Sequence, residues 1–572
     1  MKKSIIRRPT SEHPLAFVEH PVLARVYAAR GISSADQIER GFENLLPWQS
    51  LSGISQAVAC LYEALKNKQS ILVVGDFDAD GATSSALAVS ALQALGATKI
   101  GYLVPNRFEY GYGLTPEIVA VAKQKNPDWI ITVDNGISSL EGVAAAKAMG
   151  IRVIITDHHL PGTVLPDADA IVNPNVPNDL FSSKNLAGVG VIFYVMLAFR
   201  SYLREKKWFE TQRIPEPNMA QFLDLVALGT IADVVPLDTN NRILVHQGLQ
   251  RIRAGKVRPG IRALLSAANR EPENIVASDL GFAIGPRLNA AGRLDDMSLG
   301  IECLLATDFT SALAQATHLN ALNLERREIE DKMQQEALTA LNKLQLNKVL
   351  STGLCLYDST WHQGVIGILA GRLKDKLHRP VIVFALVGEN ELKGSARSVM
   401  GLHIRDALDA VATRHSGLIT KFGGHAMAAG LSLKRSNYED FSKAFNEEVE
   451  RHLMQNDLQG KIYTDGELLA EYCDIKVAEL LRDSGPWGQQ FPEPVFEGRF
   501  RILDQRLVGN KHLKLILGLG ENGQPIEAIA FNIDMKQWPN KRAEFMNIVY
   551  RLDINSFRGK RSVQLMVEHI IA

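Results

Sequence analysis

The chain contains 572 residues, and its 63 lysines and arginines balance 63 aspartates and glutamates. At about 150 residues per domain, this length predicts three to four domains. The 46% hydrophobic and 22% charged residues are typical of globular proteins. They exclude a disordered tail, a collagen-like chain and a strongly basic DNA-coating protein, although a neutral whole-chain average permits local charged patches.

The four cysteines form no CxxC pair, which excludes a zinc ribbon and a redox motif and fits a reducing compartment. The amino terminus lacks the apolar stretch of a signal peptide. The longest apolar run, residues 186–199, is too short to span a bilayer and predicts a buried helix. We therefore expect a cytoplasmic protein.

After a helical lead-in over residues 1–50, short apolar runs alternate with helical segments. Strands are predicted at 71–74, 100–104, 129–133 and 153–156, and helices at 83–95 and 139–149. This alternation indicates βαβ units and a mostly parallel sheet in an α/β fold.

Residues 301–352 contain neither glycine nor proline, and their apolar residues recur at three- and four-residue steps. This pattern predicts one or two long helices. A packed helix is the alternative, but we favour a connector between domains because strand and helix patterns restart at 354–357, 365–377 and 381–384.

The pattern of apolar and turn residues changes again beyond residue 465. Short strand-like runs separated by turn residues occur at 495–503, 513–519, 526–531, 548–554 and 562–567, as in a small β-barrel. Residues 498–572 hold 12 lysines and arginines against 7 aspartates and glutamates, so this unit is basic.

An aspartate-rich motif follows the first predicted strand: Asp76, Asp78 and Asp80 stand at alternate positions before Gly81. Closely spaced carboxylates suit Mg²⁺ or Mn²⁺. An EF-hand is excluded because its twelfth loop position is Leu87 rather than glutamate. A turn whose side chains only cap the next helix remains the structural alternative.

Three further segments favour a metal site over the structural alternative. Asp134 follows the third predicted strand, Asp157, His158 and His159 follow the fourth, and Asp233 lies in an apolar segment where an unpaired carboxylate is costly. The carboxyl ends of parallel strands share one edge of a sheet, so we expect these groups to meet there. Two metal ions held there would serve phosphoryl displacement, which predicts a metal-dependent phosphoesterase.

These motifs, in this order, resemble those of the DHH phosphoesterase superfamily. The four are Asp76-Phe-Asp78-Ala-Asp80-Gly81, Asp134-Asn135-Gly136, Asp157-His158-His159 and Gly229-Thr-Ile-Ala-Asp233. The resemblance extends to Gly285-Pro-Arg287-Leu-Asn289, Gly394-Ser395-Ala-Arg397, Gly423-Gly424-His425 and residues 485–494. It covers nearly the whole chain and is strongest toward the superfamily's single-strand-specific 5′→3′ DNA exonucleases.

The resemblance implies five segments: a lead-in (1–50), a DHH phosphoesterase domain (51–300), a connector helix (301–350), a smaller α/β DHH-associated domain that binds substrate (351–460) and an OB-like β-barrel that binds nucleic acid (461–572). It implies a two-metal enzyme, with Mn²⁺ or Mg²⁺, that releases 5′ mononucleotides during DNA repair and recombination. The implied partners are single-stranded DNA, a single-strand-binding protein and a helicase. The implied location is the bacterial cytoplasm, at the nucleoid, with no membrane association.

The resemblance also implies roles for individual residues. Metal ligands would be Asp76, Asp78, Asp80, Asp134, His158 and Asp233. His159 would act on the substrate phosphate or the attacking water, and Asp157 would orient an imidazole. Phosphate ligands would be Arg107, Ser395, Arg397 and His425, which fits the forked geometry of arginine and the close approach that glycine allows.

Weaker nucleic-acid candidates are Arg287, Asn289, Lys511, Lys514, Arg558, Lys560 and Arg561, with Phe531, Trp538 and Phe557 as stacking platforms. The alternatives are ordinary surface charge for the basic residues of the barrel, core packing for the aromatic residues, and an interdomain brace for the segment 287–293. Two other functions also stay open: a phosphodiesterase acting on RNA or small nucleotides, and a non-catalytic single-strand-binding scaffold. Every acidic and imidazole position of the motifs is present, which argues against the scaffold.

Overall fold

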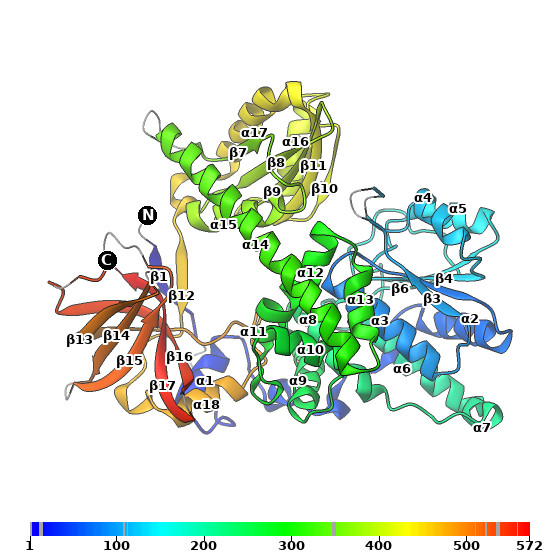
Figure 1. Cartoon of the computed structure of the whole chain (residues 1–572), viewed down its shortest axis with the longest axis horizontal. Coiled ribbons are helices and arrows are strands. Elements are labelled where there is room, and N and C mark those ends of the chain that lie inside the picture. Colours follow the sequence, from blue (N-terminus) through cyan, green and yellow to red (C-terminus); the bar gives the residue numbers. More distant parts are fainter. Residues whose placement is uncertain are drawn as a thin grey trace. The chain divides into compact units, whose positions relative to one another are not determined.

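The computed structural model describes residues 3–10, 15–106, 109–110, 112–345, 351–509, 511–520, 523–533, 538–540, 542–557 and 559–571. The chain forms two compact units (Figure 1). One contains residues 1–6 and 322–463, and the other contains residues 7–321 and 464–572. Within the described ranges, no helix is long and apolar enough to cross a membrane.

The larger unit is built on a five-stranded parallel sheet in the order β3-β2-β4-β5-β6. Its strands are β2 (Ile71–Val74), β3 (Ile100–Leu103), β4 (Trp129–Val133), β5 (Arg152–Thr156) and β6 (Ala170–Val172). The strands β2 and β4 are buried along their whole length, as expected for a parallel sheet covered on both faces. The predicted parallel sheet is therefore confirmed.

Helices cover both faces of this sheet. α4 (Pro116–Lys123) and α5 (Leu140–Ala148) pack on one face, over a core that includes Leu72, Ile130 and Val153. α2 (Ile54–Lys66), α3 (Ala79–Ala94) and α6 (Gly188–Glu205) pack together on the other side. The helix predicted at 83–95 thus begins four residues earlier, because Asp78 caps it.

A helical layer completes the DHH-like part of this unit. It consists of α8 (Leu223–Ala232), α9 (Thr239–Arg253), α10 (Pro259–Ala267), α11 (Ala277–Asp279), the π-helical turn η6 (Leu280–Ile284), α12 (Gly285–Leu294) and α13 (Ser298–Leu305). α7 (Trp208–Gln212) packs on α6, and α1 (Pro21–Ala28) packs on residues 484–491, where Tyr27 contacts Trp487 and Phe491. α8 contacts both α3 and α6, which brings the residues at its carboxyl end to the sheet edge.

The carboxyl-terminal part of this unit is a closed barrel in the order β13-β14-β15-β17-β16. Its strands are β13 (Phe496–Val508), β14 (His512–Leu519), β15 (Gln524–Ala530), β16 (Phe545–Phe557) and β17 (Lys560–Ile571), and α18 (Ile475–Asp483) packs against it. Leu513, Leu515 and Leu517 fill its interior at alternate positions. The predicted small β-barrel is confirmed.

The smaller unit has its own sheet in the order β10-β11-β9-β8-β7, parallel only between β7 and β8. Its strands are β7 (Leu354–Asp358), β8 (Val381–Val387), β9 (Glu391–Arg397), β10 (Lys421–Gly424) and β11 (Ala428–Lys434). Its helices are α15 (Ile366–Leu377), α16 (Ile404–Arg414) and α17 (Tyr438–His452). Separate apolar cores lie on the two faces of the sheet.

The predicted long connector is one helix, α14 (Phe309–Gln345), and its residues belong partly to each unit. The lead-in departs from the expectation of purely helical structure. It contains a strand, β1 (Ser4–Arg7), which pairs with β12 (Lys461–Thr464). This pairing joins residues more than 450 positions apart, and so local periodicity carries no signal for it.

Candidate metal centre

The predicted carboxylates and imidazoles gather beyond the carboxyl ends of three neighbouring strands. Asp76 and Asp78 follow β2, Asp134 follows β4, and His158 lies two residues beyond β5. Because these strands are parallel, their ends share one edge, which is where open α/β sheets bind ligands. Asp233 reaches the same place from the carboxyl end of α8.

The loop after β2 is held by backbone donors. Asp78 caps α3 by accepting hydrogen bonds from the N–H groups of Asp80 (2.9 Å) and Gly81 (3.0 Å). The buried carboxylate of Asp80 in turn accepts the N–H groups of Gly188 (2.6 Å) and Val189 (3.0 Å). These two donors belong to the first turn of α6, whose amino-terminal end favours negative charge.

Two glycines allow the helices to approach these carboxylates. A Cβ atom on Gly188 would lie 2.5 Å from the Cβ of Asp134. A Cβ atom on Gly229 of α8 would lie 2.7 Å from Oδ1 of Asp80. Both distances are shorter than van der Waals contact, so the site requires glycine at both positions.

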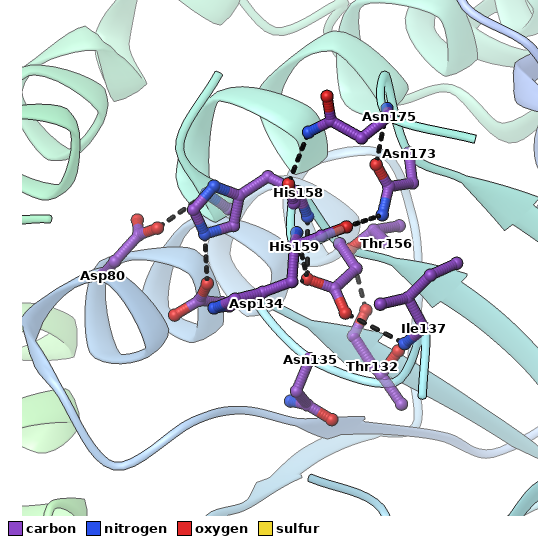
Figure 2. Close-up of polar contacts among 12 residues, drawn as sticks. Asp80, Thr132, Asp134, Asn135, Ile137, Thr156, His158, His159, Asn173 and Asn175 are labelled. Carbon is purple, nitrogen blue, oxygen red and sulfur yellow. Dashed lines mark hydrogen bonds and ion pairs between the residues drawn. The ribbon is translucent and has the colours of Figure 1, made fainter. Parts of the chain in front are cut away.

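The ring of His158 points toward Asp134 (Figure 2) and also lies close to Asp233. Its Nε2 atom is 3.1 Å from Oδ1 of Asp134 and 3.5 Å from Oδ2 of Asp233. Burial lowers the pKa of His158, which favours the neutral ring. A neutral ring nitrogen without its proton is an acceptor like the carboxylates that it faces, so a cation at this point would relieve the clash of lone pairs.

His159 is fixed by its neighbour Asp157, as expected for an orienting carboxylate. Oδ1 of Asp157 lies 2.7 Å from Nδ1 of His159 and also accepts the N–H groups of His158 and His159. Oδ2 accepts the N–H of Ile137 at 2.9 Å. Burial opposes charge on both side chains, but their mutual bond prevails: it lowers the pKa of Asp157 and raises that of His159 to about 9.

Two buried carboxylates of the cluster, Asp80 and Asp134, are destabilised in their charged form. Burial raises the pKa of Asp80, and the negative charges of Asp233 and Asp78 raise it further. Burial likewise raises the pKa of Asp134, together with the charges of Asp80 and Asp78. Several buried carboxylates facing one another are costly unless cations neutralise them.

The donor set fits divalent metal ions. Three overlapping groups have ligand atoms within 4.8 Å of one another: Asp76, Asp78 and Asp134; Asp80, His158 and Asp233; and Asp134, His158 and His159. In the described part of the chain, the buried atoms Oδ1 of Asp134 and Nε2 of His158 make no hydrogen bond. Their 3.1 Å separation suits adjacent ligands on one octahedral ion, since bonds of about 2.1 Å place such atoms about 3 Å apart.

Three polar residues at this site were missed by the sequence reasoning. The hydroxyl of Tyr112 lies 3.2 Å from Nδ1 of His159, and it donates to the carbonyl of Asp134 at 3.2 Å. Asn173 and Asn175 donate to the backbone carbonyls of His159 and His158. The only local signal for the asparagines was an Asn-Pro-Asn sequence after an apolar run, and such a sequence more often marks a turn.

Three of the four predicted phosphate ligands lie on the smaller unit. Ser395 and Arg397 share β9, and Nη1 of Arg397 donates to Oγ of Ser395 at 3.1 Å. His425 lies in the turn between β10 and β11, and Ala428, the first residue of β11, pairs with Arg397. Ser395 and Arg397 therefore share one strand, and His425 lies in the turn that leads into the neighbouring strand β11. Arg107 falls outside the described residues.

The segment 287–293 braces the aspartate loop. Oδ1 of Asn289 accepts the N–H of Ala79 at 2.8 Å, and a Cβ atom on Gly292 would lie 1.9 Å from the carbonyl oxygen of Phe77. Arg287 hydrogen-bonds Asn320 and two backbone carbonyls. All these partners belong to the larger unit, so the contacts brace a loop within it and do not test the interdomain brace. A role of Arg287 and Asn289 in nucleic-acid binding stays a prediction.

The candidate nucleic-acid-binding residues of the barrel differ in whether their side chains are exposed or paired with an acidic residue. Lys511 and Lys560 are exposed, whereas Lys514 pairs with Glu527 (3.1 Å) and Arg561 with Glu479 (2.6 Å). Phe531 is 50% exposed and contacts the ring of His512, and Trp538 is partly exposed. Arg558 and the side chain of Phe557 lie outside the described part of the chain.

Comparison with known proteins agrees with this architecture. The model of the DHH family, N-terminal domain, matches residues 70–230, the DHHA1 domain matches residues 347–451, and the RecJ OB domain matches residues 464–569. The single-stranded-DNA-specific exonuclease RecJ of Salmonella typhimurium is 57% identical over 551 residues, covering 96% of both chains.

Solved structures point the same way. The crystal structure of RecJ from Thermus thermophilus in complex with Mn²⁺ matches 96% of this chain and 76% of that chain, with 29% identity and a TM-score of 0.79. The same protein in complex with Mg²⁺ matches 96% of this chain and 74% of that chain, with 27% identity and a TM-score of 0.73. The cofactor prediction of Mn²⁺ or Mg²⁺ agrees with both. The chain belongs to the RecJ family within the DHH proteins.

Proposed function

We propose that this protein is a metal-dependent exonuclease that degrades single-stranded DNA from the 5′ end to 5′ mononucleotides. The observation that carries this proposal is the cluster of acidic and imidazole groups, Asp80, Asp134, His158 and Asp233, at one sheet edge. Bound divalent ions would lower the pKa of a water nucleophile and neutralise charge on the phosphodiester.

The geometry supports the ligand assignment that we propose. Asp76, Asp78 and Asp134 form one donor group, and Asp80, His158 and Asp233 form another. Asp134 lies 3.1 Å from His158 and so connects the two groups. His159 is cationic when bonded to Asp157, which places a positive donor beside the metal centre, where it can hold a substrate phosphate oxygen.

Two other parts of the chain would bind the DNA strand. Arg397 and Ser395 on β9 offer a cation and a hydroxyl to a terminal phosphate, with His425 on the neighbouring turn. The barrel carries exposed lysines and an exposed aromatic, Phe531, and this combination binds single strands through charge and stacking. A non-catalytic scaffold would not need the complete ligand set.

Selectivity for single strands would be steric. Asp80 is 1% exposed and Asp134 is 2% exposed, so a phosphate has to reach deeply buried ligands. A flexible single strand can thread its end into such a site, whereas a duplex is too wide. Blunt duplex and the same duplex with a 5′ single-stranded tail should therefore be digested at very different rates, and equal rates would contradict this explanation.

One experiment tests the function. Purified protein is incubated with Mn²⁺ and single-stranded DNA or RNA labelled at the 5′ or the 3′ end. We expect labelled mononucleotide at once from 5′-labelled DNA and a ladder of shortening products from 3′-labelled DNA. Faster digestion of RNA would favour the alternative substrate class, and binding without hydrolysis would favour the scaffold.

Asp80→Ala and His158→Ala serve as inactive controls. Both remove a side chain from the same donor group and leave the barrel intact. We expect hydrolysis to fall by at least about a thousandfold in each, because a metal ligand is lost, while DNA binding persists. Full activity in both variants would refute the ligand assignment.

The cellular setting of this activity is part of the proposal. We propose action at the bacterial nucleoid, in DNA repair and recombination, together with a helicase and a single-strand-binding protein. The bacterial relatives and the barrel domain support a single-strand substrate, which a helicase would supply. Co-purification of the protein from cells with and without DNA damage would identify these partners.

A further inference from the structure

Two asparagines that follow β6 contact the adjacent histidines of the metal centre through the backbone (Figure 2). Nδ2 of Asn173 donates to the carbonyl oxygen of His159 at 2.9 Å, and Nδ2 of Asn175 donates to the carbonyl oxygen of His158 at 2.6 Å. Neither amide touches an imidazole ring in these contacts. The asparagines therefore act on the direction of the backbone that carries the rings.

The histidine pair is thus held from both sides. Asp157 accepts the N–H groups of His158 and His159, and the asparagines donate to the carbonyl groups of the same two residues. Because the peptide planes on either side of each histidine are fixed, the direction of each Cα–Cβ bond is fixed as well. This direction decides where the His158 ring meets Asp134 and Asp233.

The asparagine segment is itself rigid. Asn173 is fully buried, and its Oδ1 accepts the N–H of Asn175 at 2.8 Å. Nζ of Lys184 donates to the carbonyl of Pro174 at 2.7 Å, and Asn175 donates its second amide hydrogen to the carbonyl of Lys184 at 3.3 Å. A support anchored at several points keeps the geometry of the ligands it holds.

We propose that Asn173 and Asn175 are positioning residues that set the two imidazoles of the metal centre for divalent metal binding. The inference rests on the proposed metal-dependent function. Groups that orient metal ligands from behind commonly change metal affinity or activity by about 10- to 100-fold when they are lost. Both asparagines act through the backbone of His158 and His159.

The test compares Asn175→Asp and Asn175→Ala with the wild-type protein. Asn175 is half-buried, so both variants should fold, and Asn173→Asp is a second probe at the buried position. Aspartate has nearly the same shape but lacks the N–H donor. Mn²⁺ binding is measured directly, by the electron paramagnetic resonance signal of free Mn²⁺, without any DNA. We expect affinity to fall at least about tenfold in both variants at position 175.

A matched control removes the same kind of bond elsewhere. Asn437 on the smaller unit donates its side-chain amide to the backbone carbonyl of Gly417 at 3.0 Å, and Asn437→Asp should leave Mn²⁺ affinity unchanged. The variants at position 175 should recover most of their hydrolysis rate at high Mn²⁺ concentration, with the KM for single-stranded DNA unchanged. Tighter binding by Asn175→Asp together with weaker binding by Asn175→Ala would show a charge effect and overturn the proposal.

A double-variant cycle separates positioning from general destabilisation. In a His158→Ala background, Asn175→Ala should cause little further loss of Mn²⁺ affinity, because the ring that it positions is gone. Additive losses would overturn the proposal, as would a raised KM for DNA with unchanged Mn²⁺ affinity. Failure of the wild-type protein to bind Mn²⁺ would instead refute the proposed function itself.

Discussion

Asn289 Oδ1 lies 2.8 Å from the backbone nitrogen of Ala79, although 210 positions separate the two residues. Ala79 is the first residue of α3, and its N–H follows directly after Asp78. The first N–H groups of a helix have no partner within the helix, and Asn289 provides an acceptor for one of them, the N–H of Ala79. α12 thereby fixes the loop that carries Asp76, Asp78 and Asp80.

Replacing Asn289 by alanine should loosen this loop. Loss of the hydrogen bond should cost about 1 kcal/mol in the free energy of unfolding and should lower the hydrolysis rate about tenfold, because the carboxylates lose their alignment. Urea unfolding and initial rates at saturating Mn²⁺ measure the two effects. Asn274→Ala, an exposed asparagine that bonds Glu271, is the control and should change neither. An unchanged rate in Asn289→Ala would show that α12 has no part in alignment.

Asp134→Asn should stabilise the metal-free protein at pH 7. Burial and the charges of Asp80 and Asp78 raise the pKa of Asp134. The folded state therefore binds the proton more tightly than the unfolded state, so the ionised carboxylate costs stability once the pH rises through the folded-state pKa. The asparagine carries no charge and avoids this cost.

Thermal unfolding checks this prediction in chelator and in Mn²⁺. In chelator, the variant should melt higher than the wild type at pH 7, and the difference should shrink as the pH falls. Added Mn²⁺ should raise the melting temperature of the wild type and have little effect on the variant, because a ligand that binds the folded state stabilises it. A variant that gains as much from Mn²⁺ as the wild type would argue against Asp134 as a ligand.

Arg397→Ala should weaken recognition of a 5′ phosphate. Burial lowers the pKa of Arg397, and its hydrogen bonds go to the neutral oxygens of Ser395 and Ala396, so an anion beside it would offset the cost of burying the cation. We expect the KM for 5′-phosphorylated strands to rise about tenfold or more, with a smaller rise for 5′-hydroxyl strands.

Arg397→Lys distinguishes charge from fork geometry and should recover only part of the loss. Arg435→Ala, an exposed arginine of the same unit, is the control for general charge. Equal losses on both kinds of strand end would contradict a role at the terminal phosphate.

The barrel lysines should contribute unequally to DNA binding. Lys511 and Lys560 are exposed, whereas Lys514 pairs with Glu527. Replacing either exposed lysine by alanine should reduce the slope of log affinity against log salt by about 0.7, the value for one phosphate contact on a single strand. Lys514→Ala should reduce it less. Fluorescence anisotropy in the presence of a chelator measures DNA binding without hydrolysis. Identical salt slopes in all three variants and the wild type would show that these lysines do not contact the DNA.

The linear sequence determined the α/β class, the strand ends and the type of chemistry. Strands β2 and β4 occur where hydrophobic runs predict them, because local periodicity reports which residues are buried. Asp76, Asp134 and His158 were recognisable as candidate ligands because parallel strands bring their carboxyl ends to one edge. Asp233 was a candidate because an unpaired carboxylate is costly in an apolar segment, and it reaches the site from a helix rather than from a strand.

The tertiary structure alone decided how these ligands are held. Asn173, Asn175 and Tyr112 contact the two histidines from other elements, 14, 17 and 47 positions away, and Asn289 reaches Ala79 across 210 positions. The pairing of β1 with β12 likewise joins segments far apart in the chain. Hydrogen bonds of this kind depend on distance and direction in space, which hydrophobic periodicity and local propensity do not encode. The candidate ligands could therefore be predicted from the sequence, whereas the contacts that orient them are seen only in the folded structure.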